Sequence, residues 1–393
     1  MYRKLLLISA IASSLFADVD IDVLNKAMAQ NYKAQVINQK LTQLEYEQMV
    51  EANFKYYQSV FQESQKYMQQ FIGAKWGEDN AKLSSKTTFT QYEDDFHSRQ
   101  SVDFKNGEIT IEFLDDKFFD NIKAFEKKFN DLKSQTIEKS FLKDPVNQVA
   151  IKLLKDKNIL KNTTLKDDEK LLDKDILKPI KLTKEDIKHK IVKTKQGDKK
   201  VSYIVIKMVS NQLQIKAKKY LPTVSNHTKR FDIKKSIVFG IIQTESDFNP
   251  MARSYVPAFG LMQIVPSTAG LDAYNALYHK KRILSPTYLY NANNNIEIGT
   301  KYIQIIQQQY LKGIKDKEKL FLCTTTAYNA GIGSLYRSLT SKTKKQPAIR
   351  KINQMSVKEL YKHLSTSNKL TLEAREYIVK VKKNSANFLA WDE

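Results

Sequence analysis

The spacing of apolar residues divides the first half of the chain into three stretches. Over residues 23–71 they recur every three or four positions without proline or glycine, which predicts helix across about residues 18–75. Residues 86–114 instead alternate β-branched and aromatic residues with polar ones, and Asn106-Gly107 divides them as a hairpin turn would. Residues 117–160 return to the helical spacing. The pattern therefore predicts helices around an antiparallel hairpin.

The second half begins with a change of composition. Residues 165–200 hold twelve lysines and eight acidic residues, which is typical of a solvated segment or linker. Residues 200–209, KVSYIVIKMV, then predict a strand, which we expect to close the sheet begun near residue 86. From about residue 211 helical spacing dominates. We predict an N-terminal α+β domain at 18–210 and a mostly helical domain at 211–393.

The N-terminus has the layout of an export signal. Arg3-Lys4 precede an apolar run from Leu5 to Phe16, and Ala17 precedes an acidic stretch. This order predicts a signal peptide over residues 1–17, cleaved after Ala17. No cysteine lies near that position, so we expect no lipid anchor there. The only cysteine of the sequence, Cys323, excludes an intrachain disulfide.

Charge and missing motifs narrow the chemistry. The 393 residues carry a formal net charge of +22, which favours an anionic partner. Lysine-rich composition spread over a solvated surface is the alternative explanation, because lysines and acids are interleaved along most of the chain. An exported chain without a nucleic-acid motif makes nucleic acid a poor candidate. No phosphate loop, no HExxH motif, no Cys/His cluster and no GxSxG motif occurs, so we expect neither metal nor cofactor. Acid–base chemistry by a carboxylate is what remains.

One carboxylate stands in an apolar setting. In DIKKSIVFGIIQTESDFNP, Ile237, Ile241 and Glu245 are each four residues apart, on one face of a predicted helix with Asp232 as its N-cap. Pro250 ends that helix soon after Glu245. Burial and the negative helix end both disfavour the charged carboxylate, as a general acid requires. A surface acid at a helix end is the alternative reading.

Four segments in order resemble a known family. They are Glu245-Ser246, Gly260-Leu261-Met262-Gln263, Ala327 to Gly331 (AYNAG), and Tyr377 within EAREYIVKV, together with NNNIEIGTKYI at 293–303. Their order and spacing over about residues 225–390 resemble the lytic transglycosylase domain. This resemblance implies a mostly α-helical, goose-type-lysozyme-like catalytic domain, so the expected class is α+β, with a helical and antiparallel-sheet accessory domain before it.

The resemblance also implies an activity. The family is a carbon–oxygen lyase of peptidoglycan that cleaves the MurNAc-β-1,4-GlcNAc bond and leaves 1,6-anhydroMurNAc ends. Glu245 would be its only general acid and base. Asp247 points to another face of the helix, whereas Glu297, Glu373 and Glu376 stay open as further acids. The expected substrate-binding residues are Ser246, Ser254, Met262, Gln263, Tyr328, Asn329 and Tyr377, with Gln263 on the N-acetyl group and Tyr377 orienting Glu245.

The accessory region resembles a narrower group. FTQYEDDFHSRQSVDFKNGEITIE is similar to the N-terminal domain of membrane-bound lytic murein transglycosylase C, although this chain lacks that family's lipid-bearing cysteine. The resemblance implies a periplasmic enzyme whose partner is the glycan strand of peptidoglycan. Association with the outer membrane, the wall or other wall-remodelling proteins stays open. So do two other functions, namely a hydrolytic muramidase of lysozyme type and a non-catalytic wall-binding protein.

Overall fold

The computed structural model of the chain describes residues 43–114, 121–154, 169–177 and 179–393. The predicted signal peptide and the first part of the predicted N-terminal helix lie outside these ranges. The chain divides into two compact units, Met1–Tyr56 and Tyr57–Glu393. Helix α3, Gln43–Trp76, crosses that boundary, and the account below concerns the second unit.

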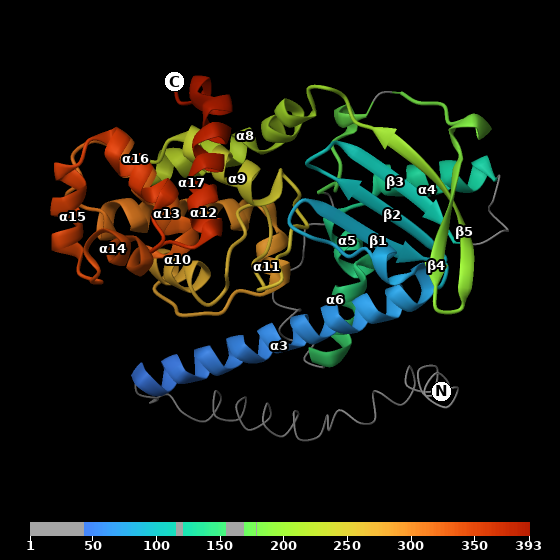
Figure 1. Ribbon diagram of the computed structural model, residues 1–393, viewed down its shortest axis with the longest axis horizontal. Coiled ribbons are helices and arrows are strands. Elements are labelled where there is room, and N and C mark those ends of the chain that lie inside the picture. Colours follow the sequence, from blue (N-terminus) through green and yellow to red (C-terminus); the bar gives the residue numbers. More distant parts are fainter. Residues whose placement is uncertain (1–42, 115–120, 155–168, 178) are drawn as a thin grey trace. The chain divides into compact units, whose positions relative to one another are not determined.

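A five-stranded antiparallel sheet organises the first part of this unit (Figure 1). Its order is β1-β2-β3-β5-β4, with the strands Thr88–Glu93, Ser98–Asp103, Glu108–Phe113, Gly197–Lys207 and Lys188–Thr194 in that order. The expected hairpin at Asn106-Gly107 is confirmed, with Gly107 at φ +69°. The predicted strand at 200–209 also joins this sheet, because Ile204 of β5 lies opposite Ile111 of β3.

Strand β4 corrects the prediction of a solvated segment at 165–200. It forms the edge of the sheet and pairs Lys190 with Val201 and Val192 with Lys199. Val192 is buried while Lys188 and Lys193 face solvent. Charged side chains are common on edge strands because they discourage pairing with other chains. The high lysine content therefore marks an edge strand as well as a linker.

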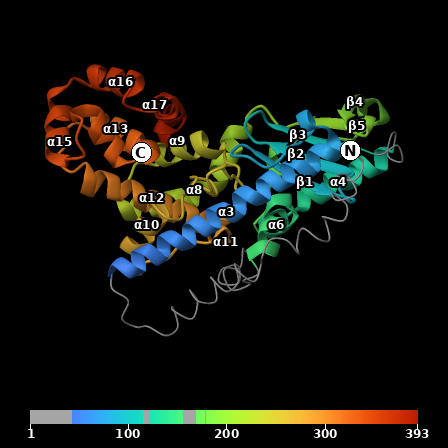
Figure 2. The same ribbon diagram turned by 60° about the horizontal axis from the view of Figure 1, so that its bottom comes forward.

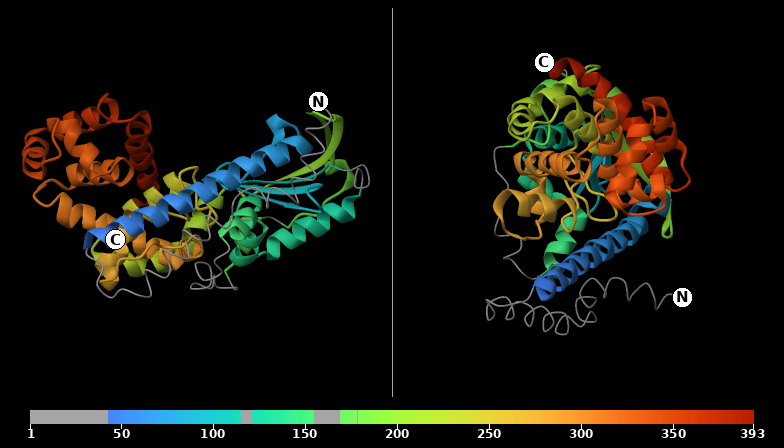
Figure 3. Two further views of the ribbon diagram at one scale, coloured as in Figure 1. Left: turned by 90° about the horizontal axis from the view of Figure 1, so that it is seen from below. Right: turned by 90° about the vertical axis from the view of Figure 1, so that its left-hand side faces the viewer.

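The two faces of the sheet are covered by different helices (Figure 3). On one face the end of α3 packs Trp76 against the ring of Tyr92 and under the guanidinium of Arg99. On the other, Phe125 of α4 packs edge-to-face on Phe113, and Gln135 hydrogen-bonds Gln91. The helices of this second face are α4 (Ile122–Ser134), α5 (Ile137–Lys143) and α6 (Pro145–Leu154).

Helices make up the rest of the unit, as predicted (Figure 2). They are α8 Gln212–Phe231, α9 Lys235–Ser246, α10 Ala269–Tyr278, α11 Pro286–Tyr290, α12 Ala292–Ile305, α13 Lys317–Ala330, α14 Ile332–Thr340, α15 Lys345–Gln354, α16 Val357–Thr366 and α17 Leu372–Ser385. Short 3-10 or π turns occupy Glu78–Asn80, Lys174–Ile176, Lys184–Asp186, Ile306–Tyr310 and Ala386–Trp391. The observed class is α+β, with the sheet preceding a mostly helical region.

Helix α9 is buried along nearly its whole length. Its apolar residues from Ile237 to Ile242 lie in the core, and Gly240 lets α17 come close, since a Cβ there would lie 2.0 Å from Ser385 Oγ. The expected N-cap at Asp232 is wrong. Asp232 instead ends α8 in a left-handed conformation, φ 55°, which short polar residues tolerate, and α9 begins at Lys235.

Candidate active site

Glu245 lies in the last turn of α9, on the apolar face that the sequence indicated. Only 7% of its side chain is exposed. Burial raises the pKa of this carboxyl, because desolvation disfavours its charged form and outweighs the lowering effect of the nearby Lys86 and Tyr377. The chain turns away immediately afterwards, with Asp247 and Phe248 both at positive φ. The helix end therefore presents a buried carboxyl that holds its proton to higher pH than a free glutamate.

Lys86, which lies in the sheet region just before β1, contacts this carboxyl. Its Nζ donates to Glu245 Oε2 at 3.3 Å, and it also lies 3.9 Å from Glu373 Oε1. The Lys86 side chain is 40% exposed and that of Glu373 is 72% exposed. A second carboxylate thus approaches the same lysine, but from the solvent side.

Two tyrosines complete the surroundings of Glu245. Burial and the charge of Glu245 raise the pKa of both Tyr328 and Tyr377 well above the ordinary value. The Tyr377 hydroxyl lies close enough to lower the pKa of Glu245, yet among the described residues it makes no hydrogen bond of normal geometry. The Tyr328 hydroxyl donates to Met262 O at 2.9 Å, which ties α13 to the loop after α9.

That loop carries the segment Gly260 to Gln263, and Asn295 of α12 holds it. The buried Asn295 amide donates to Phe259 O and Leu289 O and accepts from Met262 N, each at 2.8 Å. Gly260, at φ +76°, passes so close that a Cβ would lie 2.4 Å from Asn295 Nδ2. Met262 is fully buried. These contacts fix the backbone from which Gln263 projects.

Gln263 has one unused polar atom. Its Nε2 donates to Gly260 O at 3.1 Å, whereas its Oε1 is buried and has no partner among the described residues. A buried amide oxygen without a donor is costly unless a ligand supplies one. The atom is therefore a candidate acceptor for a bound molecule.

The other expected binding residues are placed differently. The Ser246 hydroxyl is fully buried and donates to the backbone oxygens of Ile242 and Leu261 at 3.0 and 2.8 Å, so it joins the loop to the helix end. Ser254 Oγ donates to Val256 O and accepts from Ala258 N. Asn329 is half-buried beside Tyr328. No contact within the described ranges joins Ser254 or Asn329 to Glu245, so their sugar contacts stay predictions.

The remaining acids that the sequence left open have other neighbours. Glu297 is paired with Arg230 at 2.6 Å and accepts from Tyr278 Oη at 2.8 Å. Glu376 pairs with Lys380 on the exposed side of α17. Burial raises the pKa of Asp247, and the charge of Lys216 offsets part of this increase. Among these acids and within the described ranges, Glu373 is the one that shares a contact with Glu245, through Lys86.

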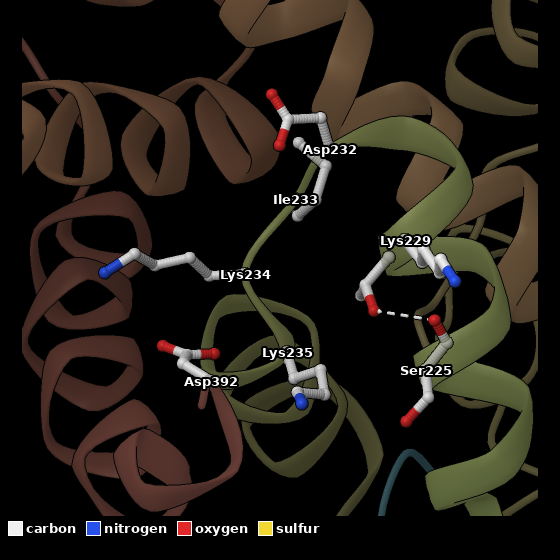
Figure 4. A pocket seen from close by; sticks show the side chains of 8 residues that line it. Ser225, Lys229, Asp232, Ile233, Lys234, Lys235 and Asp392 are labelled. Atoms are coloured by element: carbon white, nitrogen blue, oxygen red, sulfur yellow. Dashed lines mark hydrogen bonds between the residues drawn. The ribbon is translucent and has the colours of Figure 1, made fainter.

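A separate pocket of about 530 Å³ lies at the opposite end of α9 (Figure 4). Lys229, Lys234 and Lys235 line it, but Asp392 already caps this helix end, accepting from Ser236 N at 2.8 Å and Ser236 Oγ at 2.6 Å. Helix α9 is twelve residues long, with this pocket at its first turn and Glu245 in its last. It is no part of the candidate active site.

The described residues contain neither a metal-site cluster nor a membrane-spanning helix. No three His, Cys, Asp or Glu side chains in those ranges are grouped as a metal site would require. Within the same ranges, no helix combines the length and hydrophobicity needed to span a membrane.

Comparison with known proteins assigns both parts of the chain. The model of the transglycosylase SLT domain matches residues 222–351, and that of the N-terminal domain of membrane-bound lytic murein transglycosylase C matches residues 54–219. Membrane-bound lytic murein transglycosylase C of Haemophilus ducreyi is 31% identical over 322 residues, covering 80% of this chain and 83% of the relative. The chain belongs to this family. It is therefore an enzyme of the lytic transglycosylase class.

A second family member gives the same assignment. The family member from Actinobacillus pleuropneumoniae serotype 7 is 31% identical over 324 residues, 80% of this chain and 83% of its own length. Among solved structures, the 70-kDa soluble lytic transglycosylase SLT70 of Escherichia coli is 26% identical and covers 44% of this chain and 24% of its own, with a TM-score of 0.31. The assignment rests on the sequence relatives. They confirm the resemblance drawn from the four segments and from residues 89–112.

Packing brings two residues to the site that the sequence pattern did not identify, Lys86 and Asn295. Lys86 is one of many lysines interleaved with acids, and nothing in its local pattern distinguishes it. Asn295 lies within the segment NNNIEIGT, which carried the resemblance but no assigned role. The available signal was its position, since Asn295 shares a helix face with Ala292, Ile298 and Gly299, and a buried amide needs several partners.

Proposed function

We propose that this lytic transglycosylase cleaves the MurNAc-β-1,4-GlcNAc bond of peptidoglycan without water, with Glu245 as its only general acid and base. Glu245 donates its proton to the glycosidic oxygen as the bond to C1 breaks. The resulting carboxylate then accepts the proton of the muramoyl 6-hydroxyl while O6 bonds to C1. The product is a 1,6-anhydroMurNAc end. The nucleophile belongs to the substrate, so proximity supplies much of the rate.

The burial of Glu245 is the observation that carries this proposal. A general acid must be protonated near the working pH, and the apolar end of α9 raises the pKa of this carboxyl in that direction. The other carboxylate near Lys86, that of Glu373, is largely exposed. An acid with a raised pKa, to which the described residues bring only a largely exposed second carboxylate, suits a reaction that uses an internal nucleophile.

Substrate-binding roles follow from the free polar atoms. Gln263 Oε1 would accept a hydrogen bond from the N-acetyl N–H of a sugar. Tyr377 would orient Glu245 through its hydroxyl, and Met262 and Tyr328 would shape the wall beside it. Ser246 at the end of α9, Ser254 in the following loop and Asn329 in the last turn of α13 would support or contact the saccharide. We propose this set on the strength of the family's segments and the placement described above.

We also infer export to the periplasm, where peptidoglycan is the anionic partner that a net charge of +22 favours. The inference rests on the signal pattern at residues 1–17 and on the family. Peptide carboxylates on the wall polymer would provide the negative charge.

A hydrolytic muramidase is the second candidate, because Glu373 approaches the lysine that contacts Glu245. Inverting glycosidases hold two carboxylates about 6.5–9.5 Å apart, with a water between them. In that reaction Glu373 would activate water, and the products would carry reducing ends.

Mass spectrometry of products from purified sacculi separates the two. The transglycosylase gives anhydro products, about 18 Da lighter than reducing ends because no water is added, and Glu373→Gln keeps the product mass and the plateau rate measured below the alkaline limb. Reducing ends from the wild type, together with loss of activity in Glu373→Gln, would establish the hydrolase. Glu245→Gln should release neither product.

A further inference from the structure

The segment before β1 is fastened to the turn that follows Glu245. Asn249 Nδ2 donates to Ser85 O at 3.4 Å and to Lys86 O at 3.2 Å, and Arg253 N donates to Ser85 O at 3.3 Å. The segment is also closed on itself, since Ser85 N donates to Thr88 O at 2.8 Å. The backbone on both sides of Lys86 is thereby held in place relative to the end of α9.

A buried ion pair strengthens this attachment. The Arg253 side chain donates to Asp144 Oδ1 at 3.2 Å and to Asn147 Oδ1 at 2.8 Å, between the active-site loop and helices α5 and α6. Only 3% of each charged side chain is exposed. The sheet region and the loop after α9 therefore meet through a structured contact, and Lys86 extends from its margin.

The chemistry of the Lys86 contact is specific to one oxygen. An ammonium group donates hydrogen bonds and accepts none. When Glu245 is protonated, the Lys86 hydrogen bond favours Oε2 as the carbonyl oxygen of the acid, because a carbonyl oxygen is a better acceptor than a hydroxyl. The transferable proton then resides on Oε1. As that proton leaves, negative charge develops on a carboxylate that already has the ammonium at 3.3 Å.

We propose that Lys86 is a positioning residue of the active site, contributed by the sheet region, which fixes the proton of Glu245 on Oε1 and stabilises the carboxylate after proton transfer. The inference rests on the proposed function, because it requires Glu245 to be the general acid. It assigns the accessory region a part in the chemical step. Stabilisation that grows as the proton leaves accelerates that step.

The groups that face Glu245 shift its pKa in opposite directions, so removing one or another of them should move the pH dependence of activity in opposite directions. Lys86, from the segment before β1, lowers its pKa, as does Tyr377 of α17, whereas Glu373 of α17 raises it. Tyr328 of α13 stays neutral because its own pKa is raised. Activity of the free enzyme falls with rising pH as Glu245 loses its proton. Removing Lys86 should move this alkaline limb to higher pH, and removing Glu373 should move it to lower pH.

The test is kcat/KM against pH on solubilised glycan strands, using the full chain. Lys86→Met should lower the plateau about tenfold, as expected for a lost charge-assisted hydrogen bond at a partly exposed site, and should shift the alkaline limb upward. Lys86→Arg should restore most of the rate and the position of the limb. Lys188→Met, the same charge change on an exposed residue of β4, should match the wild type.

The outcomes separate this inference from the proposed function. If Glu245→Gln is active, the proposed function fails whatever Lys86 does. If Glu245→Gln is inactive while Lys86→Met keeps both plateau and limb, only the role of Lys86 is overturned. If Lys86→Met does not fold, the position of the alkaline limb is measured in Lys86→Gln and Glu373→Gln instead. A limb that stays in the wild-type position in both variants overturns the inference.

Discussion

Two buried glutamates, Glu112 in the sheet region and Glu245 in the helical region, have pKa values shifted in opposite directions. Glu112 of β3 is fully buried and receives Arg99 at 2.6 Å, Lys190 at 2.7 Å and Lys82 at 3.4 Å. Burial would raise the pKa of Glu112, but these cations hold it at about 2. Glu245 is buried almost as deeply, yet it faces one half-exposed lysine, and its pKa is raised.

The difference shows that burial alone does not decide the charge of a carboxylate. Desolvation acts on both residues in the same direction, and the number and burial of the cations determine which form is stable. Three cations make Glu112 a permanent anion that holds β2, β3 and β4 together. A single cation leaves Glu245 able to exchange a proton, as catalysis requires.

The largest effect is expected when the exchangeable proton is removed. Glu245→Gln should lower the rate of glycan cleavage by about 10²–10⁴-fold, the contribution of general acid–base catalysis, while binding to sacculi persists. Release of soluble fragments and co-sedimentation with sacculi measure the two properties. Activity within tenfold of the wild type would refute the role of Glu245.

Glu112→Gln should instead affect stability. The change leaves Arg99 buried without its counter-ion and should lower the free energy of unfolding by about 3 kcal/mol, as when other buried pairs are broken. Urea unfolding measures this value, with Glu108→Gln on the same strand as the control. Equal losses in the two variants would show that the cations do not hold Glu112 as described.

The two glutamates should also give opposite dependence of stability on pH. The pKa of Glu112 falls from 4.5 in the unfolded chain to about 2, so its contribution is complete above pH 4.5 and is lost as pH falls toward 2. Glu245, with a raised pKa, favours folding at low pH and loses that contribution as pH rises above 4.5. The deficit of Glu112→Gln relative to wild type should therefore shrink between pH 5 and pH 3.

The stability of Glu245→Gln relative to the wild type should depend on pH in the reverse sense. The variant should be more stable than the wild type at pH 7 and lose that advantage toward pH 4. Urea midpoints at matched pH values would test both variants. A parallel response of the two would contradict the contrast between the sites.

The smallest effect should come from Tyr377. Its hydroxyl lowers the pKa of Glu245 without a hydrogen bond of normal geometry, so Tyr377→Phe should move the alkaline limb of kcat/KM slightly upward. The unfolding free energy should change by less than about 1 kcal/mol, because no well-formed bond is removed. Tyr361→Phe on α16 is the control. A downward shift of the limb would show that the hydroxyl does not stabilise the carboxylate.

Local pattern predicted much of the fold. Three features could be predicted because each depends on neighbours along the chain: the alternation in residues 86–114, the turn at Asn106-Gly107 and the strand at 200–209. The position of Glu245 on an apolar helix face could be predicted for the same reason. The edge strand β4 could not be predicted, because its lysines resemble those of a linker until the partner strand is known.

What only tertiary structure decided is which charges meet. Glu245 and Lys86 are 159 residues apart in the sequence, and Glu112 and Lys190 are 78 apart. The many lysines of this chain look alike in local pattern, and packing alone selects the few that reach a buried carboxylate. The sequence by itself determined that a carboxyl group would be buried at the end of α9. The fold determined how many cations meet that group, and therefore whether it can give up a proton.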